Sequence, residues 1–396
     1  MKPEDIVIVG TARTPVGDFL GSLKTVQVVD LGVIAVKAAI ERAGIDSSLV
    51  DELACGCIYK HGQGGNPARQ IQIKSGLRVD GWAYTIDQQC ASGMKAFELV
   101  CQSLSLGKAK VGVAVGAESM TNAPYLLTKA RQGGYRMGDG SLIDSMLNDG
   151  LFCAMEKYHM GGTAENLAKE FNITREEQDE LALLSHMRAI TAREKGIPQS
   201  EIVPVEITER KKTYVVSMDE HPKSDITMEY LSSAKPAFDK SGTVTAGNSS
   251  SINDGAAAIV LTTYETAMQY GLTPLAKVVS TANFGVEPRI MGIGPAYAIP
   301  KALDLAGLTL DEIDYYEINE AFAAQFLACN RLLKLSMDKV NRNGSGIGIG
   351  HPVGCSGTRI IQALISELKY SDGQYGVASL CVGGGPSMAV VLENLK

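Results

Sequence analysis

Hydrophobic and polar positions along the chain follow two alternating patterns. Short, continuous apolar runs such as IVIVG (6–10) and KVGVAVG (110–116) are typical of strands buried on both faces of a sheet. Between such runs, apolar residues recur with helical spacing, as from Met94 to Leu104, on a helix that Gly107 is expected to end. The alternation of buried strands and amphipathic helices predicts an α/β fold.

The chain also contains an internal repeat. AAIERAGIDSSLVDEL is echoed by KALDLAGLTLDEIDYY, CASGMKAFELVCQSLSLG by GCSGTRIIQALISELKYSDG, and VGVAVGAES by YGVASLCVG. Three pairs of positions correspond in one register: Gly44 with Gly307, Ser92 with Ser356, and Gly112 with Gly376. Self-similarity at a nearly constant spacing, here 263 or 264 residues, is the mark of a duplicated unit, so we predict two similar halves related by a pseudo-twofold.

The two halves differ by a long insertion. In the second half YGVASLCVGGG runs directly into the last strand, whereas the matching strand of the first half, GAAAIVLTT, comes only after residues 121–252. The insertion carries a helix of its own, with Thr174 and Glu177 spaced as a capping box. We therefore predict three parts: residues 1–120 with 253–272 as the N-terminal core half, 121–252 as an inserted loop domain, and 273–396 as the C-terminal core half.

Composition excludes several classes of function. The 396 residues carry a net charge of −7, which argues against a nucleic-acid-binding surface. No apolar run approaches the roughly 20 residues of a membrane span, and a strand pattern begins so early that we expect no leader peptide and a cytoplasmic protein. The eight cysteines include no CxxC pair and the five histidines show no ligand spacing, so we expect neither a disulfide framework nor a metal site.

Cys90, in IDQQCASGMKA (86–96), is the first candidate for chemistry. It comes just before the helix that contains Met94, where free backbone N–H groups and the helix dipole favour an anion and lower the pKa of a thiol. The alternative is a small residue that fills a core, because cysteine is among the most buried residue types.

His351 is the second candidate. It lies in NGSGIGIGHPVGCSG (343–357), three residues before Gly354, which matches Cys90 in the repeat. If the two turns meet across the pseudo-twofold, the histidine lies near the cysteine and can activate a thiol nucleophile. The alternative is a purely structural histidine.

Two further clusters follow buried strands. Cys381 precedes three glycines in SLCVGGGPS, and glycines bring backbone N–H groups close enough to a ligand to form an oxyanion hole. Asn319, in EINEAFAAQF, interrupts an apolar pattern between a strand and a helix. It is either the N-cap of that helix or an amide that holds a water or a carbonyl.

Together these clusters resemble the thiolase family over essentially the whole chain, most closely its acetyl-CoA acetyltransferase branch. The resemblance rests on CASGMKA, ESMTNAPY, YHMGGTAEN, TREEQD, TVTAGNSSSINDGAAA, IMGIGP, NEAFA, GHPVGCSG and CVGGG, which occur in the family's order. It implies a five-layer αβαβα core, a loop domain that binds coenzyme A, and a homo-oligomer (dimer or tetramer). It also implies acyl-CoA substrates, with coenzyme A as a substrate and no bound cofactor.

The resemblance implies a role for each catalytic position. Cys90 would take up the acyl group as a thioester, and His351 would activate its thiol. Cys381 would move the α-proton, and Asn319 would hold a water that stabilises the enolate with His351. The backbone N–H groups of Cys90 and Gly383 would form an oxyanion hole. The implied coenzyme A and acyl-group positions are Leu151, His159, Met160, Phe238, Ala246, Ser250, Met291, Ala321 and Phe322.

The chain departs from the family's usual pattern at a few positions. Pro386 and Ser387 follow the three glycines, Lys223 stands where an arginine is common, and Tyr230 replaces a serine. The expected reaction is the reversible condensation of two acetyl-CoA to acetoacetyl-CoA and CoA, with ping-pong kinetics. The alternatives are a thiolase for longer or branched 3-oxoacyl-CoA, a carrier-protein-dependent ketosynthase, against which CVGGG argues, and an inactive subunit of a complex.

Overall fold

The computed structural model describes residues 1–395, and its centre is two β-sheets. The first has the strand order β4-β3-β5-β10-β1, with the short β2 beside β10, and the second has the order β11-β14-β13-β12. A short antiparallel pairing of β1 with β11, at Val7 and Ile8, joins them into one ten-stranded sheet within these residues. The strands are β1 (Ile6–Arg13), β2 (Gly17–Asp18), β3 (Glu52–Gly56), β4 (Trp82–Ile86), β5 (Val111–Ser119), β10 (Asn253–Thr263), β11 (Ala276–Gly285), β12 (Tyr315–Ile318), β13 (Tyr375–Cys381) and β14 (Pro386–Asn394).

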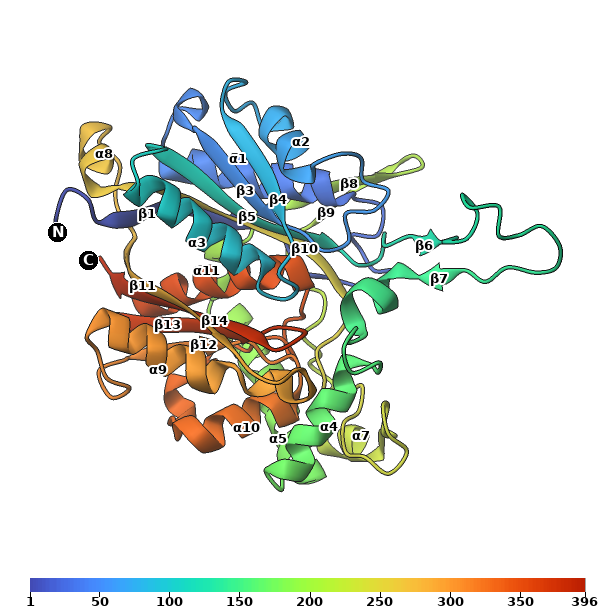
Figure 1. Ribbon diagram of the computed structural model, residues 1–396. Coiled ribbons are helices and arrows are strands. Elements are labelled where there is room, and N and C mark those ends of the chain that lie inside the picture. Colours follow the sequence, from blue (N-terminus) through green and yellow to red (C-terminus); the bar gives the residue numbers. More distant parts are fainter. Residues whose placement is uncertain (396) are drawn as a thin grey trace.

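Helices form three layers around these sheets, as Figure 1 shows. The central layer, between the sheets, consists of α3 (Ser92–Ser105) and α11 (Val353–Ser371), which contact each other. The outer layer of the first half contains α1 (Val28–Ala43) and α2 (Pro67–Lys74), and that of the second contains α9 (Pro295–Ala306) and α10 (Ala323–Leu333). The order helix, sheet, helix, sheet, helix is the five-layer αβαβα architecture expected from the sequence.

Burial on both faces explains why the strands are continuously apolar. Val113 and Val115 of β5 pack in the outer core with α1, whereas Ala114 between them packs in the central core with α3 and α11. Successive side chains of a strand point to opposite faces, so a strand between two helical layers needs apolar residues at every position.

The repeated Ser-Gly pairs of the two halves bring α3 and α11 together. A Cβ atom added at Gly93 would lie 2.4 Å from the Thr358 side-chain oxygen, and one added at Gly357 would lie 2.4 Å from the Met94 nitrogen. Both distances are shorter than real contacts, so each helix needs glycine where it crosses the other. The two turns that precede these helices therefore lie close together, as the repeat predicted.

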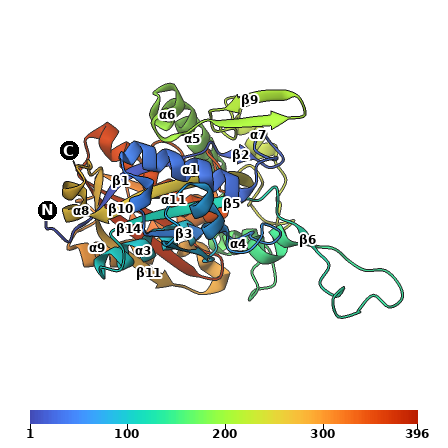
Figure 2. The same ribbon diagram turned by 90° about the horizontal axis from the view of Figure 1, so that it is seen from above.

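Residues 121–252 lie between β5 and β10 in the sequence, although these two strands are neighbours in the sheet. Their elements are β6 (Tyr125–Leu126), β7 (Ile143–Asp144), η2 (Leu147–Leu151), α4 (Met160–Glu170), α5 (Arg175–Glu194), α6 (Ile197–Glu201), β8 (Val205–Glu209), β9 (Lys212–Val216) and α7 (Met228–Ser233). The capping box predicted from Thr174 and Glu177 is present at the start of α5. In Figures 1 and 2 the segment between β6 and β7 projects away from the body of the molecule. The exact domain boundaries stay a prediction.

The remaining elements are short. They are η1 (Ser47–Leu49), α8 (Tyr264–Gln269), η3 (Pro288–Ile293) and η4 (Met337–Lys339). Among residues 1–395, no helix combines the length and the apolar character that crossing a membrane requires.

Candidate active site

Cys90 lies in the tight turn between β4 and α3. Gln89 has a positive φ of 48°, and the Ser92 hydroxyl fixes the turn by accepting the Gln88 N–H at 2.9 Å and donating to the Gln89 carbonyl at 2.6 Å. The backbone N–H groups of Gly383 and of Cys90 itself lie close enough to the Cys90 sulfur to lower the pKa of its thiol. The sulfur is therefore held against two backbone donors, the arrangement that stabilises an oxyanion.

The environment of Cys90 raises the pKa of its thiol to about 11. Burial is the main cause, and the carboxylates of Glu118 and Asp87 add to it, while the two N–H groups act in the opposite direction. The expectation that the helix start lowers this pKa is therefore wrong, because the cost of burying a thiolate outweighs the donors. A thiol that stays protonated at neutral pH needs a base to become a nucleophile.

His351 is placed to be that base. Its Nδ1 lies 2.6 Å from the Ser356 hydroxyl, which itself donates to the Pro352 carbonyl at 3.0 Å. Because the hydroxyl has one hydrogen and gives it to Pro352, it accepts the Nδ1–H of His351, which leaves Nε2 unprotonated. Burial, with a smaller effect from Arg359, lowers the pKa of His351 to about 3, so the ring is neutral at ordinary pH.

The backbone around His351 is fixed from the first half of the chain. Its N–H donates to the Asn253 side-chain oxygen at 2.8 Å. The preceding Gly350 has a φ of 113°, and a Cβ there would lie 2.7 Å from the Asn253 side chain. Only glycine combines that conformation with so close an approach.

Asn319 is brought to the same site from the end of β12. Its side-chain nitrogen lies 3.4 Å from Nε2 of His351, and its side-chain oxygen has no hydrogen-bond partner within residues 1–395. The alternative role as a helix N-cap is wrong, because α10 begins at Ala323 and Phe322 is its N-cap. A buried amide oxygen without a partner is suited to holding a water or a substrate group.

Cys381 is the last residue of β13 and is completely buried. Burial raises the pKa of its thiol well above the usual value, and the neighbouring Cys90 and Cys329 raise it further. Gly384 and Gly385 have φ values of 88° and 106°, so the chain turns sharply after the strand and presents Gly383 to Cys90. The structure thus brings Cys90, Cys381 and Gly383 together.

A cavity of about 550 Å³ opens beside this site. His351 lines it, as do Met120, Leu151, Ile252 and Val353, and these four apolar side chains form one cluster with Cys90. The inner end of the cavity therefore lies beside Cys90. Six predicted coenzyme A positions are part of its lining: Leu151, His159, Phe238, Ala246, Ser250 and Phe322.

Aromatic rings form one wall of this cavity. The His159 ring stacks on Phe238 with centroids 4.5 Å apart, and Phe322 meets Phe238 edge-on at 6.0 Å. The other three predicted positions, Met160, Met291 and Ala321, lie behind the wall in the core of the second half. The Ala321 carbonyl accepts the Ser250 N–H at 2.9 Å and so supports the lining.

The outer part of the cavity contains polar residues that the sequence patterns did not indicate. His186 and His221 have ring centroids 5.4 Å apart, and the Nδ1 atom of His221 lies 2.7 Å from an Asp18 oxygen. Lys223 and Tyr230, the departures from the family pattern, also line this part. No sequence spacing connects positions 18, 186 and 221, so only the fold could identify them as neighbours.

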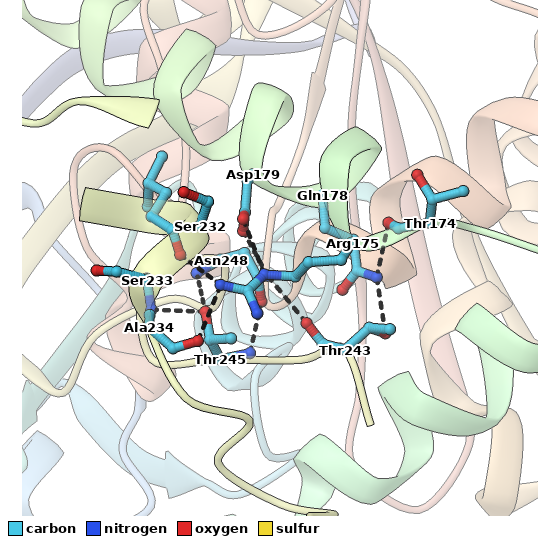
Figure 3. Close-up of polar contacts among 12 residues, drawn as sticks. Thr174, Arg175, Gln178, Asp179, Ser232, Ser233, Ala234, Thr243, Thr245 and Asn248 are labelled. Carbon is cyan, nitrogen blue, oxygen red and sulfur yellow. Dashed lines mark hydrogen bonds and ion pairs between the residues drawn. The ribbon is translucent and has the colours of Figure 1, made fainter. Parts of the chain in front are cut away.

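The loop that carries Ala246 and Ser250 is held by a buried polar network, shown in Figure 3. Arg175 pairs with Asp179 at 2.8 Å and donates to the Ala234 carbonyl at 3.0 Å. The other Asp179 oxygen accepts from the Asn248 side chain at 2.9 Å, and Asn248 in turn accepts the Thr245 N–H at 2.7 Å. The start of α5 therefore fixes one wall of the cavity.

The site offers no evident metal position. Within residues 1–395, no three His, Cys, Asp or Glu side chains group in a way that could hold a metal ion. The chemistry available is that of two thiols, an imidazole, an amide and backbone donors, which suits acyl transfer through a thioester.

Comparison with known proteins agrees with this geometry. The N-terminal domain model of thiolases matches residues 6–265, and the C-terminal domain model matches residues 272–394. The chain therefore belongs to the thiolase family.

Individual relatives match nearly end to end. Acetyl-CoA acetyltransferase of Escherichia coli (strain K12) is 51% identical over 99% of this chain and 100% of its own length. The protein of the same name from Cupriavidus necator is 48% identical over 98% and 99%. The solved structure of acetyl-CoA acetyltransferase from Syntrophomonas wolfei superposes with a TM-score of 0.97, at 47% identity, over 100% of both chains.

Proposed function

We propose that this chain catalyses the reversible condensation of two acetyl-CoA to acetoacetyl-CoA and CoA, through an acetyl thioester on Cys90. The observation that carries the proposal is the convergence, at the inner end of one cavity, of a thiol, a neutral imidazole and backbone donors. Near-full-length similarity to proteins named acetyl-CoA acetyltransferase supports the choice of substrate.

In the first half-reaction Cys90 attacks the thioester carbonyl of acetyl-CoA. Nε2 of His351 takes the thiol proton, the new sulfur–carbon bond forms, and the bond to coenzyme A breaks. Cys381 then gives its proton to the departing coenzyme A thiolate, which leaves Cys381 as the thiolate, while His351 keeps the proton of Cys90. The N–H groups of Cys90 and Gly383, which face the sulfur in the structure, are close to where the tetrahedral oxygen develops.

In the second half-reaction Cys381, as the thiolate, takes a proton from the methyl group of a second acetyl-CoA. The carbanion attacks the acetyl carbonyl, a carbon–carbon bond forms, and Cys90 leaves as a thiolate that takes back the proton held by His351. Asn319 and His351 stabilise the enolate oxygen.

Several expectations remain predictions of the resemblance: a cytoplasmic homo-oligomer and the absence of a bound cofactor. The strand β4 is the outermost strand of its sheet within residues 1–395 and lies directly before the Cys90 turn. Its outer edge is available for pairing with a second copy, which is consistent with a dimer formed next to the site.

The test is a comparison of kcat/KM for thiolysis of acetoacetyl-CoA, longer 3-oxoacyl-CoA and 2-methyl-branched 3-oxoacyl-CoA. We expect acetoacetyl-CoA to have the largest value by at least about tenfold, since one methylene in a shaped pocket changes specificity by about that factor. A larger value for a longer or branched substrate would contradict acetyl specificity and favour a thiolase for longer or branched 3-oxoacyl-CoA. No turnover of any substrate would favour the inactive subunit.

A further inference from the structure

Glu118, near the end of β5, is a completely buried carboxylate close to the site. Three backbone N–H groups donate to it: Ile58 at 3.1 Å, Tyr59 at 3.0 Å and Gly354 at 2.9 Å. The Cys57 thiol lies 3.7 Å from one of its oxygens. Neither the sequence patterns nor the proposed mechanism gives this group a role.

These donors belong to the two parts of the chain that the reaction must align. Ile58 and Tyr59 follow β3 and pack in the apolar cluster that contacts Cys90. Gly354 is the second residue of α11, three positions after His351. A Cβ at Gly354 would lie 2.5 Å from a Glu118 oxygen, so the carboxylate reaches the helix only because this residue is glycine. One side chain thus connects the Cys90 side of the site to the turn that carries His351.

An amide does not substitute for this carboxylate. Its oxygens accept only from N–H groups and a thiol, and the NH₂ group of a glutamine would face one of these donors. Burial raises the pKa of Glu118 to about 7, although the three N–H groups lower it. Burying an ionisable group is costly unless it is hydrogen-bonded, and here the hydrogen bonds hold two segments in place.

We propose that Glu118 is a positioning residue: it fixes the start of α11, and with it His351, relative to Cys90. The inference rests on the proposed roles of those two residues. It assigns Glu118 no contact with the substrate. Its negative charge has a second effect, because it opposes formation of the Cys90 thiolate and so makes the reaction depend on His351 as the base.

The charge effect gives a readout that a loss of stability would not produce. Besides Cys90, the titratable groups affected by Glu118 include Cys57, Tyr59 and Cys355. Burial keeps all three in the neutral form, since it raises the pKa of each well above its usual range. Asp87 also raises the pKa of Cys90 and is unchanged by substitutions at Glu118.

The experiment compares Glu118→Gln with Glu118→Asp in the full-length protein. Iodoacetamide alkylation of Cys90, followed by peptide mass spectrometry from pH 7 to 10, reports the thiolate, and acetoacetyl-CoA thiolysis reports kcat and KM. For Glu118→Gln we expect kcat to fall at least about tenfold, KM to stay within threefold, and alkylation at pH 9 to be about threefold faster. Glu118→Asp keeps the charge, but its side chain is too short to bond both the segment after β3 and the start of α11. We therefore expect kcat to fall similarly and the alkylation rate of Cys90 to be unchanged.

Glu52→Gln is the matched control. Glu52 is a buried carboxylate at the start of β3, the end away from Ile58 and Tyr59, where it accepts a hydrogen bond from Tyr84 at 2.5 Å. Its substitution therefore tests the effect of removing a buried carboxylate away from the site. We expect it to leave the alkylation profile and kcat unchanged.

If Glu118→Gln keeps kcat within twofold, or loses activity with an unchanged alkylation profile, the inference is wrong. If Glu118→Gln does not fold, kcat of Glu118→Asp decides: a fall of at least about tenfold supports the inference, and a value within twofold of wild type contradicts it. A wild-type protein that turns over no acyl-CoA would instead contradict the proposed function, and the alkylation arm would still test the charge of Glu118.

Discussion

The turn before α3 and the turn before α11 occupy equivalent places in the two halves but carry different groups. At the spacing that relates Ser92 to Ser356, Cys90 corresponds to Gly354 and Asp87 to His351. The first turn supplies the candidate nucleophile and no histidine, and the second supplies the histidine, with glycine at the position of Cys90. The duplicated backbone brings two helix starts together, and divergence of a few side chains gives them complementary chemistry.

The two equivalent serines show the same divergence. The Ser92 hydroxyl accepts a backbone N–H from Gln88 and so only shapes its turn. The Ser356 hydroxyl accepts from the His351 ring and so sets which nitrogen of that ring is free. Equivalent serines thus have different roles: Ser92 stabilises a turn, and Ser356 orients the histidine.

Cys90→Ala gives the largest expected effect, because in the proposed mechanism it removes the group that carries the acetyl intermediate. We expect thiolysis of acetoacetyl-CoA to fall by at least about 10³-fold, with little change in stability. Steady-state rates measured on purified protein would check this. Cys101→Ala, which removes a buried thiol on α3, the helix that follows Cys90, is the control and should stay within about threefold of wild type. Substantial turnover by Cys90→Ala would contradict a covalent route.

His351→Ala removes the base from the second turn, and we expect kcat to fall about 10²–10⁴-fold. Ser356→Ala keeps the ring but loses the acceptor that fixes its tautomer, so we expect a loss of about tenfold. Ser371→Ala, whose hydroxyl also bonds a backbone carbonyl four residues earlier on α11, is the control. Because the ring is neutral down to a pKa of about 3, His351 should contribute no acidic transition near pH 6.5 to kcat. A transition near pH 6.5 that disappears in His351→Ala would show that the ring gains a proton in this range. It would contradict a neutral ring with Nε2 unprotonated.

The cavity wall gives a smaller effect of a different kind. Asp179→Asn removes the charge that pairs with Arg175 and disturbs the contact with Asn248. Since the network positions a binding loop and no reacting group, we expect KM for acetoacetyl-CoA to rise about tenfold with kcat within threefold. Ser233→Ala, whose hydroxyl bonds only the Tyr230 carbonyl in the same region, should change neither. A fall in kcat at unchanged KM would place the network in the chemistry itself.

Stability against pH provides the smallest expected effect. Burial, with His221 and Lys223, lowers the pKa of His186 to about 3, against about 6.5 in an unfolded chain. Between these values the unfolded state binds more protons, so His186 contributes stability above pH 6.5 that is lost as the pH falls toward 3. Glu118 and Glu317 act in the opposite direction, because their folded pKa values are raised to about 7 and about 8.

Because these groups oppose one another, we predict the difference in Tm between wild type and His186→Gln. Between pH 7 and pH 4, the Tm of His186→Gln should fall by about 2 °C less than that of wild type. Differential scanning calorimetry at matched ionic strength would measure this. Parallel Tm curves would show that His186 does not contribute to the pH dependence.

The repeat and the buried strands allowed the fold to be predicted, because both are local patterns that the sequence displays directly. The positions of Cys90, His351 and Cys381 followed from the same patterns, since the first two lie in the turns before the two equivalent helices and Cys381 ends a buried strand. Contacts between distant residues did not follow: Glu118 meets Gly354 across the two halves, and Asp18 meets His221, only once the chain is folded. The pKa of Cys90 was predicted in the wrong direction because the depth of its burial depends on the whole fold.

The most direct test of the account follows the acetyl group itself. Wild-type protein and the His351→Ala variant are mixed with acetyl-CoA, quenched in acid within the first turnover, and mapped by peptide mass spectrometry. We predict an acetyl group on Cys90 of the wild type that is absent, or at least about 100-fold slower to appear, in the variant. An acetyl group on another residue, or equal acetylation of Cys90 in both proteins, would contradict the claim that one half supplies the nucleophile and the other its base.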